Sequence, residues 1–143
     1  MKLPDVNLFL YAYDSESSRH AEARQWIEEI MSGTETVALA WPTLMGFIRL
    51  STKGAVISRP LEVGRAIDFV EEWLAQPAVT VVHPTDRHAG VLRDLLTPLG
   101  AGGNLTSDAH LAALAIEHGA TLYSSDNDFS RFAGLRWIDP LRG

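Results

Sequence analysis

Three aspartates, Asp5, Asp108 and Asp126, are the residues of this sequence best suited to chemistry. Asp5 ends a short apolar segment, and Asp126 comes shortly after another that ends at Tyr123. Asp108 lies in the first turn of a predicted helix that follows a glycine-rich loop. Carboxylate oxygens are preferred ligands of hard cations such as Mg²⁺ and Mn²⁺. If the three carboxylates converge, they repel one another unless such an ion holds them. We therefore expect one metal site built from all three.

Each of these acids also has a structural role open to it. Aspartate commonly caps helices, which suits Asp5. The helix dipole favours a negative charge in a first helical turn, which suits Asp108. Asp126 and Asp128 flank Asn127 and fit a turn. For a single acid the structural role stands first, and only the shared placement of all three favours the metal site.

Short apolar segments alternate with amphipathic helices along the chain. Ala23, Trp26, Ile27 and Ile30, for example, recur at the spacing of one helix face. The alternation predicts a single α/β domain over residues 1–143, with a mostly parallel sheet and right-handed crossovers. Functional groups of such sheets gather beyond the carboxyl ends of the strands. The predicted strands are 3–5, 36–40, 79–82, 120–123 and 135–138, and the predicted helices are 6–13, 18–32, 42–53, 60–75, 86–99 and 104–118.

The composition narrows the class of protein. The chain has 143 residues, 46% of them hydrophobic, which is typical of one folded domain. It has no cysteine, so disulfides, thiolate metal sites and a cysteine nucleophile are excluded. It also has no apolar run of membrane-spanning length and no signal-peptide pattern. We expect a cytoplasmic protein with no membrane partner.

The net charge of −6 has the wrong sign for an ordinary nucleic-acid-binding protein. A bound divalent cation would reverse the local field of an acidic site. Basic residues are also concentrated in one stretch, where Arg49, Lys53, Arg59 and Arg65 have only Glu62 among them. This stretch is either part of a substrate surface or plain solvated surface.

Four segments of the chain, 3–7, 41–52, 107–115 and 119–129, resemble PIN-domain proteins, specifically VapC-type toxin ribonucleases of bacterial toxin–antitoxin pairs. The resemblance implies a three-layer α/β/α fold with a short, mostly parallel sheet. It implies an endoribonuclease that uses Mg²⁺ or Mn²⁺ to activate a water for in-line attack on an RNA phosphodiester. It also implies a cognate antitoxin protein as partner, and a homodimer.

Within this resemblance, Asp5, Asp108 and Asp126 match the metal-site aspartates of the family. Asn7 and Ser125 match the small polar positions beside them, and Asp128 is an accessory acid. Arg49 is a candidate for contacting a phosphate, with a surface role equally open. The expected site residues beyond the three aspartates are thus Asn7, Ser125, Asp128 and Arg49.

The chain departs from the family at one position. The family usually has a glutamate in its third helix a few residues before the arginine, whereas residues 43–49 contain no acid and Gly46 lies near the expected place. Three alternatives stay open: another acid completes the site, three aspartates and water suffice, or metal binding is weaker. With one acid missing, we expect one ion instead of two.

Two other functions remain open. If the missing acid is essential, the chain is a PIN-like module that binds RNA or a protein partner without cleaving RNA. A receiver-type phosphorylation domain also gathers acids at strand ends, but it needs a late strand-end lysine. Because Lys2 and Lys53 are the only lysines, the receiver class ranks low. The five histidines show no metal-binding spacing.

Overall fold

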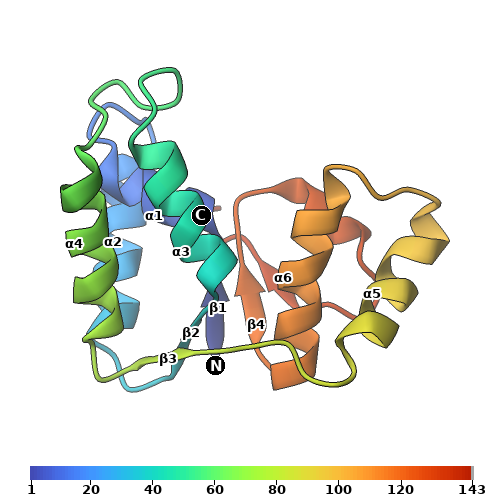
Figure 1. Cartoon of the computed structure of the whole chain (residues 1–143). Helices are drawn as coiled ribbons and strands as arrows, with labels where there is room; N and C mark the ends of the chain where they lie inside the picture. The colour runs from blue at the N-terminus through green and yellow to red at the C-terminus, as the bar shows by residue number, and fades with distance from the viewer. Residues whose placement is uncertain (143) are drawn as a thin grey trace.

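The computed structural model describes residues 1–142, which form helices and strands in regular alternation (Figure 1). The strands are β1 Lys2–Pro4, β2 Val37–Leu39, β3 Val79–Val81, β4 Thr121–Tyr123 and β5 Trp137–Ile138. The α-helices are α1 Val6–Tyr13, α2 His20–Met31, α3 Trp41–Ser51, α4 Val63–Leu74, α5 His88–Leu96 and α6 Leu105–His118. Short 3₁₀ turns cover Thr97–Leu99 and Asn127–Arg131.

The five strands form one sheet in the order β3-β2-β1-β4-β5, and every neighbouring pair is parallel. The chain first builds outward from β1 through β2 to β3, then crosses back to place β4 on the other side of β1. The direction of winding therefore reverses between β1 and β4. In open parallel sheets this switch point is where ligands bind, beyond the carboxyl ends of the strands.

Helices cover both faces of the sheet and make a three-layer α/β/α sandwich. Figure 1 shows α1 to α4 on one side, with α5 and α6 on the other. The side chains of β2 alternate accordingly: Val37 and Leu39 pack into the core beneath α1 to α4, and Ala38 packs into the core beneath α5 and α6. The predicted fold class is confirmed, with the refinement that the sheet is wholly parallel.

Local sequence explains where the site-bearing helices begin and end. Pro42 occupies the first turn of α3, where its missing N–H leaves no helical hydrogen bond unmade. α6 ends at His118 and is capped by Gly119, whose φ of 66° suits glycine better than any other residue. The first strand ends at Pro4, one residue earlier than predicted, so Asp5 is the N-cap of α1. None of the helices in the described part of the chain has the length and apolarity that crossing a bilayer requires.

Candidate metal centre

Asp5 lies at the switch point, between the end of β1 and the start of α1. Its backbone N–H donates to the carbonyl of Tyr123 on β4 (2.8 Å), so the two strand ends are joined here. Its Oδ1 accepts a hydrogen bond from the Val6 N–H at 2.7 Å, which is the capping interaction. The capping role and the place in the site therefore coincide in one side chain.

Ser124 connects the parts of the site. Its buried hydroxyl donates to Asp5 Oδ2 at 2.8 Å and accepts from Asn7 Nδ2 at 3.2 Å. The same oxygen accepts the backbone N–H of Asp126 at 3.0 Å. One donor and two acceptor positions are all that a hydroxyl offers, so each is used. Ser124 thereby holds Asp5, Asn7 and Asp126 in fixed relation.

Three carboxylates converge at this edge of the sheet. Asp108, Asp126 and Asp128 each have an oxygen within 4.8 Å of those of the other two. Asp108 comes from the first turn of α6. Asp126 caps the 3₁₀ turn by accepting the Asp128 N–H at 2.9 Å. The structure thus brings Asp128, expected as an accessory acid, into the closest group, whereas Asp5 lies just outside it.

The electrostatics of the four acids are coupled. Burial raises the pKa of Asp108, and the charges of Asp126, Asp5 and Asp128 add to the rise, which brings it to about 6. Burial also raises the pKa of Asp5, although its hydrogen bonds from Ser124 and Val6 oppose the rise. Like charges this close disfavour ionisation. A divalent cation is the natural means of keeping all four carboxylates ionised.

The donor set fits a hard cation. It consists of carboxylate oxygens, which Mg²⁺ and Mn²⁺ prefer, and it includes no sulfur. The amide oxygen of Asn7, next to this group through Ser124, is buried and has no hydrogen-bond partner among the described residues. An orphaned buried acceptor is rare in native proteins, and a cation or an ordered water satisfies it. Asp108, Asp126 and Asp128 are the residues that could hold the ion.

The position of the missing helix acid is also visible. A Cβ added to Gly46 of α3 would meet Val6 Cγ2 at 3.5 Å, so this residue lies against the first residue of α1, next to Asp5. That distance is ordinary van der Waals contact, so nothing in the packing excludes a side chain here. Asp128 supplies a further carboxylate in its absence.

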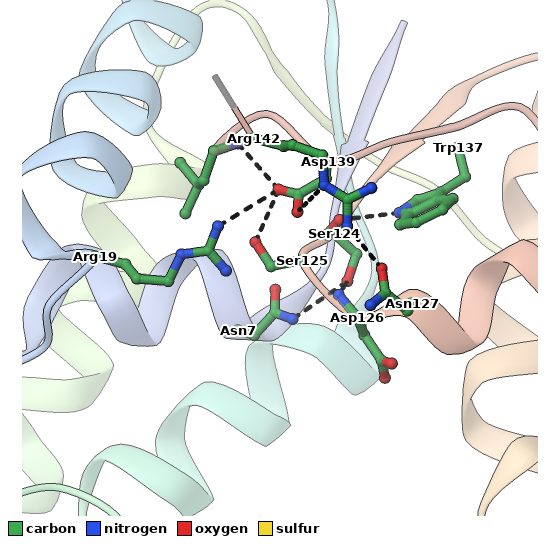
Figure 2. A network of polar contacts seen from close by, with 10 residues as sticks. Asn7, Arg19, Ser124, Ser125, Asp126, Asn127, Trp137, Asp139 and Arg142 are labelled. Atoms are coloured by element: carbon green, nitrogen blue, oxygen red, sulfur yellow. Dashed lines mark hydrogen bonds and ion pairs between the residues drawn. The ribbon is translucent and has the colours of Figure 1, made fainter.

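Two expected site residues lie elsewhere. The hydroxyl of Ser125 donates to Asp139 at 3.0 Å instead of facing the acids (Figure 2). Successive residues of an extended segment point in opposite directions, which is why Ser124 takes the place expected for Ser125. Arg49 is exposed on α3, and its side chain forms no hydrogen bond or ion pair within residues 1–142.

Ser124 and Asp139 are the site residues that the sequence reasoning missed. For Ser124 the signal was present: it is the first residue after an apolar strand, where the alternation of β4 continues. For Asp139 there was no such signal, since its role depends on the approach of Arg19 from a distant segment as well as on the nearby Arg142.

Known proteins share both the sequence and the fold. Residues 2–135 match the family model described as PIN domain. Ribonuclease VapC37 of Mycobacterium tuberculosis is 46% identical over 98% of this chain and 97% of its own length. Ribonuclease VapC33 of the same species is 42% identical over 99% of each chain.

Solved structures agree on the fold. One is described as VapBC2 from Rickettsia felis bound to a DNA fragment from their promoter; its matching chain has a TM-score of 0.70, 17% identity and 96% coverage of each chain. Mycobacterium tuberculosis VapC20, described as a sarcin-ricin loop cleaving toxin, has a TM-score of 0.68 at 19% identity, covering 95% of this chain and 99% of its own. With its four acids at the switch point of a parallel sheet and a family match over nearly its whole length, the chain belongs to the PIN-domain family, in the VapC group.

Proposed function

We propose that the protein is a metal-dependent endoribonuclease, the toxin of a type II toxin–antitoxin pair, that hydrolyses RNA phosphodiesters. The observation that carries the proposal is the convergence of Asp108, Asp126 and Asp128 beside Asp5. The names of the relatives, ribonucleases VapC37 and VapC33, support the same substrate class. The proposal places the protein in the cytoplasm, where its RNA substrate is.

The roles of the residues follow from their contacts. Asp108, Asp126 and Asp128 would hold the ion, and Asp5 would orient it or the attacking water. A bound Mg²⁺ or Mn²⁺ supplies a water of lowered pKa and neutralises charge that develops on the phosphodiester. Ser124 fixes Asp5 Oδ2, and its acceptance of the Asp126 N–H fixes the turn that carries Asp126. Asp5 and Asp126 are thus restrained before substrate arrives, which favours catalysis.

The test is incubation of the purified protein with total bacterial RNA and Mg²⁺ or Mn²⁺, followed by mapping of the cut ends. We expect discrete cleavage sites that disappear with EDTA and with Asp5→Asn. Asp94→Asn is the matched control, because Asp94 is an exposed aspartate on α5. Cleavage by folded, metal-saturated Asp5→Asn at the parental rate would overturn the proposal.

A second function is favoured by one observation, the absence of an acid at Gly46 on α3. If that acid is essential, the protein is an RNA- or partner-binding module of PIN fold. RNA binding without cleavage at any concentration of Mg²⁺ or Mn²⁺ would support this function over the first.

The proposal includes a protein partner and a second copy of the chain. Structures of the same fold are described as VapBC complexes from Rickettsia felis and from Salmonella typhimurium, both bound to DNA. We expect a cognate antitoxin to bind this chain and suppress its activity, and a homodimer in solution. Expression in bacteria should arrest growth for the parent and not for Asp5→Asn, and sedimentation of the purified protein reports the dimer.

A further inference from the structure

A buried carboxylate just after β5 holds two arginines beside the acids. The side chain of Asp139 is only 6% exposed. Its Oδ1 lies 3.9 Å from Arg19 Nη2, and its Oδ2 lies 3.9 Å from Arg142 Nε. The carboxylate also accepts hydrogen bonds from the Ser125 hydroxyl and the Leu141 N–H, each at 3.0 Å. Figure 2 shows the two arginines approaching Asp139 from different sides.

Asp139 is separate from the acids of the metal centre. Ser125 turns toward Asp139, while the carboxylate of the next residue, Asp126, points away from it (Figure 2). One negative and two positive side chains give the group Arg19, Asp139 and Arg142, hereafter the arginine clamp, a net charge of +1. It contrasts with the four carboxylates that lie next to it.

A hydrogen bond connects the clamp to the turn that carries Asp126 and Asp128. Arg142 Nη2 donates to Asn127 Oδ1 at 3.0 Å, and Asn127 lies between Asp126 and Asp128. Arg19 comes from the other side of the site, just before α2, with its guanidinium 5.6 Å from the centre of the Tyr11 ring. Arg142 is therefore tied to the turn that carries two of the acids, and Arg19 lies beside the ring of Tyr11 on α1.

Both arginines have donors left for a ligand. A guanidinium has five N–H donors, and the contacts just described use only a minority of them. The Arg19 side chain is 33% exposed, and the Arg142 side chain is 67% exposed. Fixed guanidinium groups that face solvent suit bidentate binding of a phosphate.

We propose that Arg19 and Arg142 bind a backbone phosphate of RNA next to the one that is cleaved, with Asp139 as the positioning residue. This deepens the proposed function and rests on it. Four carboxylates and a net charge of −6 repel a polyanion, so a nuclease of this kind needs local positive charge at the rim of its site. The clamp supplies that charge.

The experiment measures the affinity for a short, fluorescein-labelled, mixed-sequence single-stranded RNA by anisotropy, in EDTA and over a range of KCl. We expect Arg19→Gln and Arg142→Gln each to weaken binding roughly fivefold. The double variant Arg19→Gln/Arg142→Gln should reduce the slope of log K against log salt by about 0.7, the value for one phosphate contact on a single strand, and each single variant should reduce it by part of that. Melting curves check that each variant is folded at the assay temperature.

Arg136→Gln is the matched control. Arg136 is exposed and donates to the Gly119 carbonyl at 2.8 Å, at the amino end of β4 and so at the opposite edge of the sheet. Arg136→Gln removes one positive charge, as Arg19→Gln and Arg142→Gln do, but away from the site. The affinity for RNA should therefore stay at the parental value.

Asp139→Asn distinguishes positioning of the two arginines by Asp139 from the effect of net charge on RNA binding. It makes the protein more positive by one, so long-range electrostatics alone would tighten RNA binding. If Asp139 positions the arginines, binding weakens instead. Tighter binding by Asp139→Asn would overturn the positioning role.

The clamp and the nuclease fail in different ways. The clamp is overturned if the double variant Arg19→Gln/Arg142→Gln keeps the parental RNA affinity and salt slope, or if the parent itself binds no RNA. Cleavage of total RNA in Mg²⁺ would still support the nuclease in either case. Arginine-dependent binding without cleavage in any metal supports the clamp and overturns the nuclease.

Discussion

Asp5 shows why single residues of this site are ambiguous in the sequence. Its Oδ1 caps α1 through the Val6 N–H, and its Oδ2 accepts from Ser124. The capping role and the role in the metal centre were alternatives for the sequence, and the structure makes them compatible. The residue type predicts an acid that accepts hydrogen bonds, while the second role depends on Ser124, 119 residues away in the chain.

The raised pKa of Asp108 predicts a cost in stability when no metal is bound. Its value in the folded protein, about 6, exceeds the ordinary 3.8, so the native state binds the proton more tightly than the unfolded chain does. The free energy of unfolding in EDTA should therefore fall as pH rises from about 4 to about 6. Asp108→Asn should stabilise the metal-free protein at pH 7 by about 1 kcal/mol, a value discounted for partial exposure.

Urea unfolding in EDTA at pH 7 and pH 4 measures this effect. The gain from Asp108→Asn should shrink at pH 4, where the parental carboxyl is already protonated. Asp94→Asn, at an exposed position on α5, should show neither the gain nor the pH dependence. A destabilised Asp108→Asn at pH 7 in EDTA would contradict the prediction.

Gly46 offers a test of the missing acid. Gly46→Glu should increase affinity for Mn²⁺, because an added Cβ meets only ordinary contacts with Val6 and the side chain begins next to Asp5. Either Glu or Gln in place of glycine should also stabilise α3 by about 0.5–1 kcal/mol through helix propensity. Gly46→Gln is therefore the control, sharing the helix effect without the charge. Calorimetric titration with Mn²⁺ separates them, and equal affinities in the two variants would show that position 46 does not reach the ion.

At the scale of elements, periodicity predicted each helix and strand but not the side-chain contacts between neighbouring helices. The bounds of α1 agree with the prediction, and the segment around Asn127, expected as a turn, is a 3₁₀ turn. The hydrogen bonds that join α5 to α6 had no such signal. Glu117 accepts from the Thr85 hydroxyl and N–H, and from His88, which in turn pairs with His110 at 2.9 Å. Pairs of this kind depend on which helices become neighbours.

The Glu117 contacts predict a pH-dependent stabilisation of the α5–α6 pair. Burial opposes ionisation of Glu117, but the hydrogen bonds from Thr85 and His88 outweigh it and lower the pKa of the carboxyl. The stabilisation is thus present above the unfolded value near 4.5 and is lost as pH falls through the lower folded value. Glu117→Gln should cost about 1–3 kcal/mol at pH 7, since it removes a charged acceptor from a buried network.

Urea unfolding of the parent and Glu117→Gln at pH 7 and pH 3.5 checks the sign. The difference between the two proteins should be smaller at the lower pH. Glu71→Gln, at an exposed position on α4, provides the comparison for loss of a negative charge alone. A difference that grows as pH falls would contradict the prediction.

At the scale of the molecule, the order of the strands is what assembles the site. Placing β4 beside β1 brings Ser124, Asp126 and Asp128 to Asp5, and α6 delivers Asp108 to the same edge. The alternation of elements predicted a common edge for the acids. It could not predict that Asp128 would belong to the closest group, or that Asp139 would collect Arg19 and Arg142, because both depend on turns and on contacts between distant segments.

The whole molecule should therefore be stabilised by the ion that its acids attract. A ligand that binds only the folded state adds about 2.7 kcal/mol at a hundredfold excess over its Kd, so Mg²⁺ or Mn²⁺ should raise the melting temperature of the parent. The rise should vanish with EDTA, diminish below about pH 6 as Asp108 takes up a proton, and be lost in Asp108→Asn and Asp126→Asn. Asp94→Asn should retain it. Differential scanning fluorimetry over a metal titration measures the shift, and an equal shift in Asp108→Asn and the parent would place the ion away from these carboxylates.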